Sequence, residues 1–223
     1  LLYFADDFLM RKFNKKTRSR LSAMLADTQC VLEIDELYRG EVEQGVNDYY
    51  TREGMAVFNT ENTLWQSLFG LVFWHELFVE SPYPPCNEFD IYPQVLRLGN
   101  FYEAQQTQIN ERLAQCQTSQ ALLNLVCKNA AQYFDQPNGL FRWRSNLLEP
   151  LEALILNSPL EALIAHLAAM SKHYLQLKDG YPDLMVINNG QVHFEEVKAP
   201  GDKLRRNQLT TIDNLKNVGF TVH

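Results

Sequence analysis

The feature that most constrains the fold of this chain is an Asn189-Gly190 pair between two short runs rich in β-branched and aromatic residues. Asn-Gly is the strongest short-range signal for a two-residue type I′ hairpin turn. With these residues at the centre of the turn, the register of the hairpin places Asp183 directly opposite Glu196. Because side chains alternate between the faces of a strand, Lys198 lies on the same face as both carboxylates.

Two carboxylates at directly opposed positions destabilise a strand pair, since their Cβ atoms are only about 4.5–5.5 Å apart. A divalent cation resolves this conflict, and hard oxygen ligands favour Mg²⁺ or Mn²⁺. The pattern is Pro-Asp, twelve residues, then Glu-Val-Lys, the PD-(D/E)xK arrangement of metal-dependent nucleases. A surface hairpin with a cross-strand Lys–Glu pair gives the same spacing, so spacing alone leaves both interpretations open.

Most of the remaining chain has the patterning of helices. We expect helices at residues 5–25, 36–50, 60–78, 109–116, 122–134 and 160–174, and a proline-rich loop at 81–93. Thr60 is the expected N-cap of the third helix, which is apolar nearly all round and therefore buried. After the hairpin, Asp202 is the expected N-cap of a helix from Lys203 to Asn217, which Gly219 ends before a further strand.

Composition narrows the class of protein. The chain has 223 residues, 46% of them hydrophobic, and a net charge of -7. This excludes a disordered chain, and we expect a protein with no membrane span. The cysteines (Cys30, Cys86, Cys116 and Cys127) are too widely spaced for a zinc knuckle and suit a reducing compartment.

The acidic balance by itself counts against nucleic-acid binding. The positive charges are nevertheless concentrated in two clusters. One is at residues 11–20, and the other is formed by Lys198, Lys203, Arg205 and Arg206. Each cluster fits either a solvated helix face or a track of phosphate contacts, and Lys203, Arg205 and Arg206 are the candidate DNA contacts.

Three segments carry a resemblance to a known family. GYPDLMV (180–186), FEEVKAPGDKL (194–204) and RRNQ (205–208) resemble the VRR-NUC domain, a PD-(D/E)xK branch found at the C-terminus of Fanconi-associated nucleases. ENTLWQSLFGLVFWHELF (61–78) resembles the helix that brings a distant glutamate to the metal. ERLAQC (111–116), LFRWRSNLLEPLEALI (140–155) and HLAAM (166–170) resemble the helical linking segment. The likeness extends over residues 33–223.

The resemblance implies roles for individual residues. It implies metal ligation by Glu61, Asp183 and Glu196 and by the backbone carbonyl of Val197, with Lys198 as the catalytic lysine and Gln208 facing the site. From position alone, Glu61 also fits a favourable charge at a helix N-terminus. The chain departs from the family where Leu209, Thr210 and Thr211 replace an aromatic residue, and at residues 173–180, where the loop is slightly longer.

The implied fold is an α/β restriction-endonuclease-like PD-(D/E)xK core, a mixed sheet with flanking helices, joined to a large all-helical N-terminal portion. We expect residues 1–34 to end a helical, repeat-like region. Residues 35–223 then form a VRR-NUC domain with a helical insertion at about 80–160. Because the chain begins with Leu1 and stops inside a predicted strand, we expect a fragment truncated at its C-terminus.

The implied function is a Mg²⁺- or Mn²⁺-dependent 5′-flap endonuclease and 5′→3′ exonuclease that acts in DNA interstrand-crosslink repair. Its expected partners are branched or flapped duplex DNA and DNA-repair proteins, in the nucleus of a eukaryote or the cytoplasm and nucleoid of a bacterium. Converging carboxylates repel, so we expect raised pKa values in the metal-free site. The alternatives are a Holliday-junction-resolvase-like VRR-NUC nuclease and a non-catalytic helical DNA-binding adaptor.

Overall fold

The structure is a computed structural model that describes residues 31–83, 89–199, 202 and 204–223. In chain order its elements are the 3₁₀ turn η1 (Glu36–Tyr38), α3 (Val42–Arg52), β1 (Ala56–Asn59), α4 (Glu61–Val72), the π-helical turn η2 (His75–Val79), α5 (Gln94–Arg97), α6 (Phe101–Gln115), α7 (Ser119–Gln132), α8 (Leu148–Asn157), α9 (Leu160–Leu177), β2 (Leu184–Asn188), β3 (Gln191–Glu195), α10 (Arg206–Val218) and β4 (Thr221–Val222). The helix expected at residues 5–25 and the basic run at 11–20 lie outside the described residues.

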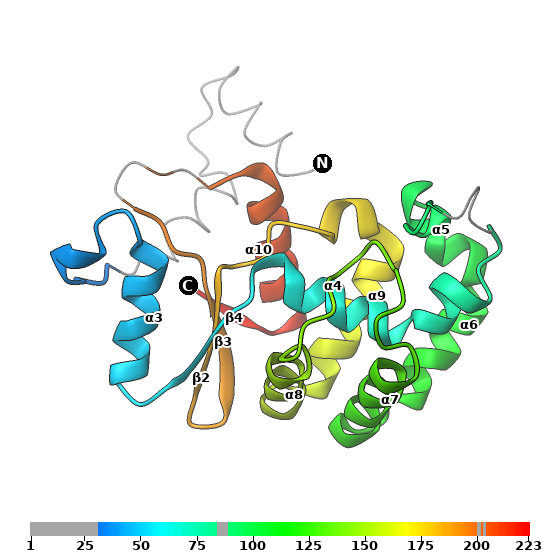
Figure 1. Cartoon of the computed structure of the whole chain (residues 1–223), viewed down its shortest axis with the longest axis horizontal. Coiled ribbons are helices and arrows are strands. Elements are labelled where there is room, and N and C mark those ends of the chain that lie inside the picture. The colour runs from blue at the N-terminus through cyan, green and yellow to red at the C-terminus, as the bar shows by residue number, and fades with distance from the viewer. Residues whose placement is uncertain (1–30, 84–88, 200–201, 203) are drawn as a thin grey trace, which may run out of the picture.

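The strands form one mixed sheet in the order β1-β2-β3-β4 (Figure 1). The predicted hairpin register is confirmed, because Leu184 pairs with Glu195. Asn189 and Gly190 both have positive φ, as a type I′ turn requires. β4 joins β3 in parallel, and β1, a strand that the sequence analysis does not predict, pairs antiparallel with β2.

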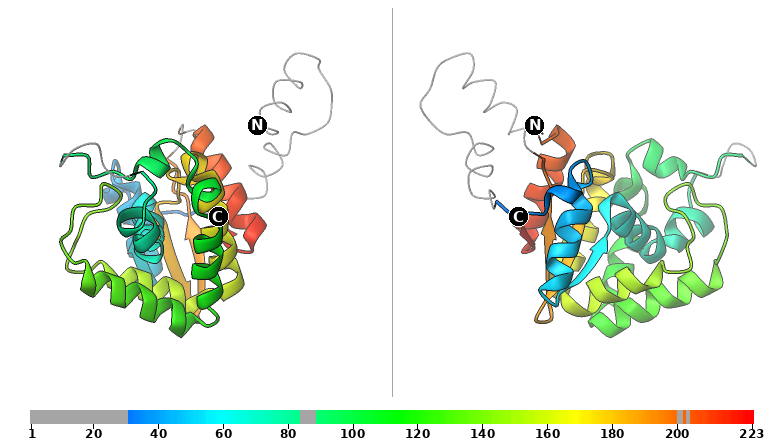
Figure 2. Two further views of the ribbon diagram at one scale, coloured as in Figure 1. Left: turned by 90° about the vertical axis from the view of Figure 1, so that its right-hand side faces the viewer. Right: turned by 60° about the vertical axis from the view of Figure 1, so that its left-hand side comes forward.

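Helices cover both faces of this sheet, as expected for the α/β class (Figure 2). On one face, α3 inserts Val46 against Leu184 and Val186. On the other face, Phe194 joins a larger core in which the α4 residue Trp65 is 1% exposed. α7 and α8 pack against α4, and α9 packs against α6 and α10. The apolar helix predicted after Thr60 therefore lies at the centre of the molecule. No helix in the described ranges has the length and apolarity to cross a bilayer.

Several expected helix boundaries are wrong, among them the start of α6, which lies at Phe101 and not at residue 109. The helix expected at 36–50 is broken at Gly40, whose φ of 95° no regular helix accommodates. Thr60 makes no side-chain cap, and α4 ends at Val72. α10 begins only at Arg206, because Asp202 closes a local turn through its Oδ2, which accepts the N–H of Ala199 at 3.1 Å. Gly219 ends α10 in a left-handed conformation, as predicted.

Candidate active site

The start of α4 lies directly against the segment that precedes β2. The backbone N–H groups of Thr60 and Glu61 both donate to the carbonyl oxygen of Asp183, at 3.0 and 3.4 Å. One residue further on, Asn62 Oδ1 accepts the N–H of Tyr181 at 3.2 Å. The pairing of β1 with β2 leads the chain to this point. Two carboxylates far apart in the sequence, Glu61 and Asp183, are thereby brought together.

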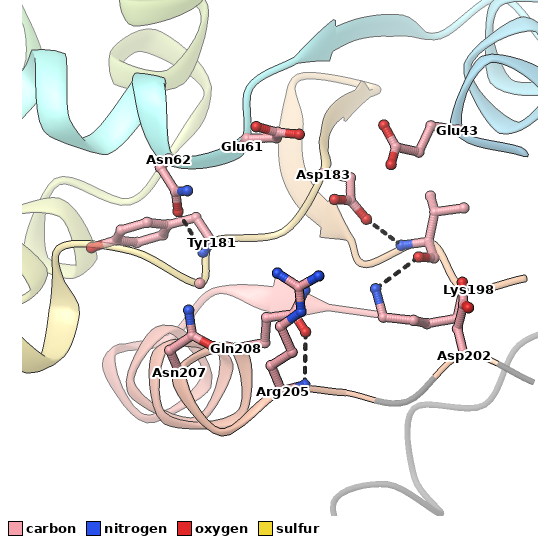
Figure 3. A pocket seen from close by; sticks show the side chains of 12 residues that line it. Glu43, Glu61, Asn62, Tyr181, Asp183, Lys198, Asp202, Arg205, Asn207 and Gln208 are labelled. Carbon is pink, nitrogen blue, oxygen red and sulfur yellow. Dashed lines mark hydrogen bonds between the residues drawn. The ribbon is translucent and has the colours of Figure 1, made fainter. Parts of the chain in front are cut away.

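A third carboxylate, Glu43 of α3, completes an acidic cluster. One carboxylate oxygen from each of Glu43, Glu61 and Asp183 lies within 4.8 Å of the others (Figure 3). Glu43 reaches this position because it precedes Val46 by one helical turn, and Val46 packs against Leu184. Glu43 is not among the site residues predicted from the sequence. Its only local signal is its three-residue spacing from Val46, which any amphipathic helix provides.

The backbone of Glu61 is strained. Its φ is +37°, in the left-handed region that non-glycine residues avoid. Such a conformation costs about 1–3 kcal/mol and persists only where the surrounding structure holds it. Here the hydrogen bond from the Glu61 N–H to the Asp183 carbonyl fixes the residue. The strain therefore falls on the residue that directs its carboxylate toward Asp183.

Glu196 lies beside this cluster, with its side chain only 4% exposed. Its Oε1 accepts hydrogen bonds from Lys198 Nζ and from Gln208 Nε2, the latter at 2.6 Å. Its Oε2 is buried and has no hydrogen-bond partner among the described residues. A buried acceptor without a donor is costly, so this oxygen is suited to a cation. The hairpin register predicts that the Glu196 and Asp183 carboxylates lie in one cluster. In the structure the Glu196 side chain instead points toward Lys198 and Gln208, which bind its Oε1.

Val197 links the two carboxylates through its backbone. Its N–H donates to Asp183 Oδ2 at 2.8 Å, and its carbonyl oxygen accepts from Lys198 Nζ at 2.9 Å. The Lys198 ammonium therefore contacts two of the groups that the resemblance implies as metal ligands, the Glu196 carboxylate and the Val197 carbonyl.

Burial and the proximity of other carboxylates raise the pKa values of these groups. Burial raises the pKa of Glu196 to about 7, and the charge of Asp183 adds to the effect, while the hydrogen bond from Lys198 opposes it. Burial also raises the pKa of Asp183, with a further contribution from Glu61. Partial burial and the charges of Asp183 and Glu61 raise the pKa of Glu43. The raised direction of these pKa values agrees with the prediction for converging carboxylates, but burial contributes more to it than their mutual repulsion.

The cluster opens into a cavity of about 400 Å³, whose lining includes Glu43, Glu61, Asp183, Lys198, Arg205 and Gln208. Gln208 Oε1 accepts the N–H of Arg205 at 2.8 Å, so both ends of its amide are engaged at the start of α10. Arg206 is exposed and does not line the cavity. Lys203 lies outside the described residues. Of the three cations predicted to contact DNA, Arg205 alone is placed here by the described residues.

A buried polar network contacts the wall of the cavity at Tyr181. His166 of α9 contacts Asn214 Oδ1 at 2.7 Å through Nδ1 and the Tyr181 hydroxyl at 2.8 Å through Nε2. Full burial lowers the pKa of His166 to about 4, so the ring is neutral near pH 7. The network ties α9 and α10 to the segment before Asp183. Both ring nitrogens are occupied, so neither is free to bind a metal ion.

Known proteins resemble this chain in sequence. Residues 118–223 match the VRR-NUC domain. The Fanconi-associated nuclease 1 homolog of Oryza sativa subsp. japonica is 28% identical over 83% of the chain, and that of Pseudomonas aeruginosa 29% identical over 75%. The human Fanconi-associated nuclease 1 is 27% identical over 81% of the chain. The chain spans only 20%, 30% and 18% of these three relatives, respectively.

Solved structures extend the comparison to the fold. The crystal structure of paFAN1 bound to 2nt 5′ flap DNA with gap superposes with a TM-score of 0.74, at 23% identity, over 96% of this chain and 40% of that chain. The complex of paFAN1 with 1nt 5′ flap DNA gives a TM-score of 0.71 at 25% identity, over 81% of this chain and 34% of that chain. Residues 118–223 therefore match the VRR-NUC domain, and over most of its length the chain is similar to Fanconi-associated nucleases.

Proposed function

We propose that this chain is the catalytic part of a metal-dependent DNA nuclease that hydrolyses phosphodiester bonds. The observation that carries the proposal is the convergence of Glu43, Glu61 and Asp183 within 4.8 Å, beside the Glu196–Lys198 pair and in one cavity. We further propose a 5′-flap endonuclease and 5′→3′ exonuclease activity in interstrand-crosslink repair. The names of the relatives and the flap DNA bound to paFAN1 support this finer assignment.

The donor set fits Mg²⁺ or Mn²⁺. It consists of oxygen atoms, from the carboxylates of Glu43, Glu61 and Asp183, the unpartnered Oε2 of Glu196 and the Val197 carbonyl. Hard divalent cations prefer such ligands, whereas zinc and copper sites favour imidazole and thiolate. When bound, the cation supplies Lewis-acid polarisation of a phosphoryl oxygen and acidifies a water molecule.

The residues of the chain supply positioning and charge. The Lys198 ammonium, held by Glu196 and Val197, directs a positive charge into the cavity, where it stabilises negative charge that develops on the phosphate. Gln208 holds the Glu196 carboxylate through a 2.6 Å hydrogen bond and so fixes the partner of Lys198. Arg205 lines the same cavity and is available to a neighbouring phosphate.

The test is cleavage of a labelled 5′-flap duplex in Mn²⁺, with an EDTA control. Glu61→Gln should abolish cleavage while DNA binding persists. The matched control is Glu161→Gln, because Glu161 is likewise an exposed glutamate in the first turn of a long helix but lies outside the cavity. A four-way junction in parallel measures any resolvase-like preference. DNA binding without metal-dependent cleavage would contradict the nuclease proposal and leave the adaptor.

A further inference from the structure

A second cavity, of about 740 Å³, is also lined by residues at the start of α4. Thr63 and Gln66 of α4 line it, whereas their neighbours Glu61 and Asn62 line the acidic cavity. Its other wall is the loop between α7 and α8, which contributes Arg142, Trp143 and Arg144. We call this second cavity the arginine groove. The first two turns of α4 therefore contribute residues to both cavities.

Arg142 and Arg144 give the groove its charge. Both side chains are exposed, and within the described ranges no carboxylate lies at ion-pair distance from either. Asp135 is the acidic residue of the described lining. Two cations beside a site built from carboxylates are informative in a chain of net charge -7, because the acidic cluster by itself repels a polyanion.

The loop that carries these arginines is held in place. Asn138 Oδ1 accepts the N–H groups of Leu140 and Phe141, at 2.8 and 2.9 Å. Trp143 donates its Nε1–H to the carbonyl of Gln136 at 2.8 Å, and its ring lies 5.7 Å from that of Trp74. Trp143 is half-buried, while the arginine on either side of it is exposed. The anchored tryptophan therefore presents two guanidinium groups from one fixed segment.

We infer that the arginine groove binds backbone phosphates of the DNA strand that continues past the acidic cluster. The inference rests on the proposed nuclease function and assigns the path of its substrate. Guanidinium groups bind phosphate oxygens in a bidentate geometry, and neutralisation of phosphates makes binding depend on salt.

The test compares Arg142→Gln/Arg144→Gln with Arg52→Gln/Lys128→Gln. The control pair removes the same charge from exposed residues outside both cavities. Binding of a labelled 5′-flap duplex is measured in EDTA between about 50 and 200 mM salt. The groove variant should bind roughly tenfold more weakly than wild type, and its slope of log affinity against log salt should fall by about 2. The control should match wild type.

Two DNA substrates show whether the groove binds the single-stranded flap or the duplex. A loss confined to the flap substrate assigns the groove to the single strand, and an equal loss with a nicked duplex that lacks a flap assigns it to the duplex. An unchanged salt slope in the groove variant overturns the inference, and the nuclease proposal still stands if Glu61→Gln abolishes cleavage. Conversely, the groove variant could show a reduced salt slope while the wild-type chain never cleaves DNA. That result would support phosphate binding by the arginine groove and contradict the nuclease proposal.

Discussion

Gly180 is the position where one added methyl group should damage the candidate site most. Its φ is +81°, and a Cβ built there would lie 2.5 Å from the carbonyl carbon of Asn207 and 2.6 Å from the N of Gln208. Both are backbone atoms at the start of α10, so they cannot move aside by a side-chain rotation. Gly180→Ala therefore has to shift either the segment before Asp183 or the start of α10.

The cost has two parts. An alanine in the left-handed region costs about 1–2 kcal/mol, and overpacking against fixed atoms costs about 1–3 kcal/mol. A total of about 3 kcal/mol lowers the Tm of a chain of this size by roughly 6–12 °C. Any shift of α10 also moves Gln208 away from Glu196. Because a misplacement of about 1 Å in a catalytic site costs on the order of 100-fold in rate, single-turnover cleavage should fall by about that factor.

The matched control is Gly190→Ala in the hairpin turn. Gly190 also has a positive φ, of +74°, but a Cβ at this position would have open space around it, with Asn157 Oδ1 as its nearest neighbour at 3.9 Å. This variant should lose only the conformational contribution of about 1–2 kcal/mol and keep full cleavage. Thermal unfolding and single-turnover cleavage are measured on both variants. Equal losses of stability in the two, or full activity in Gly180→Ala, would refute the reasoning.

Three further predictions concern the carboxylates and the buried histidine. Glu43→Gln should weaken Mn²⁺ binding at least about tenfold in calorimetry, whereas Glu41→Gln, an exposed neighbour, should not. Because the pKa of Glu196 is raised to about 7, protons compete with the cation, so Mn²⁺ affinity should rise from about pH 5.5 to pH 8; equal affinities would count against a carboxylate site. The pKa of His166 is lowered to about 4 from 6.5, so its contribution to stability is present above pH 6.5 and is lost as the pH falls toward 4, by at most about 3 kcal/mol. Urea unfolding at about pH 7 and pH 4.5 should show a smaller difference in His166→Gln than in wild type.

Local physics explains the parts of the fold that the sequence predicts. The Asn189-Gly190 turn requires positive φ at both residues, which fixes the register of β2 and β3 and places Asp183 near Glu196. Hydrophobic periodicity likewise predicts most of the long helices, because it depends only on neighbours within one or two turns. It does not predict the first half of α6 or any of α8. Glu61 is different, since only the family resemblance, and no spacing, singles it out.

Tertiary contacts decide the rest. Glu43 reaches the cluster because α3 packs on β2. β1 forms because Asn59 pairs with Leu184, a residue far from it in the sequence. Glu196 turns to Lys198 and Gln208 once α10 packs beside it. No local pattern encodes these distances. The hairpin therefore follows from short-range backbone preferences, whereas the composition of the acidic cluster depends on how segments remote in sequence pack together.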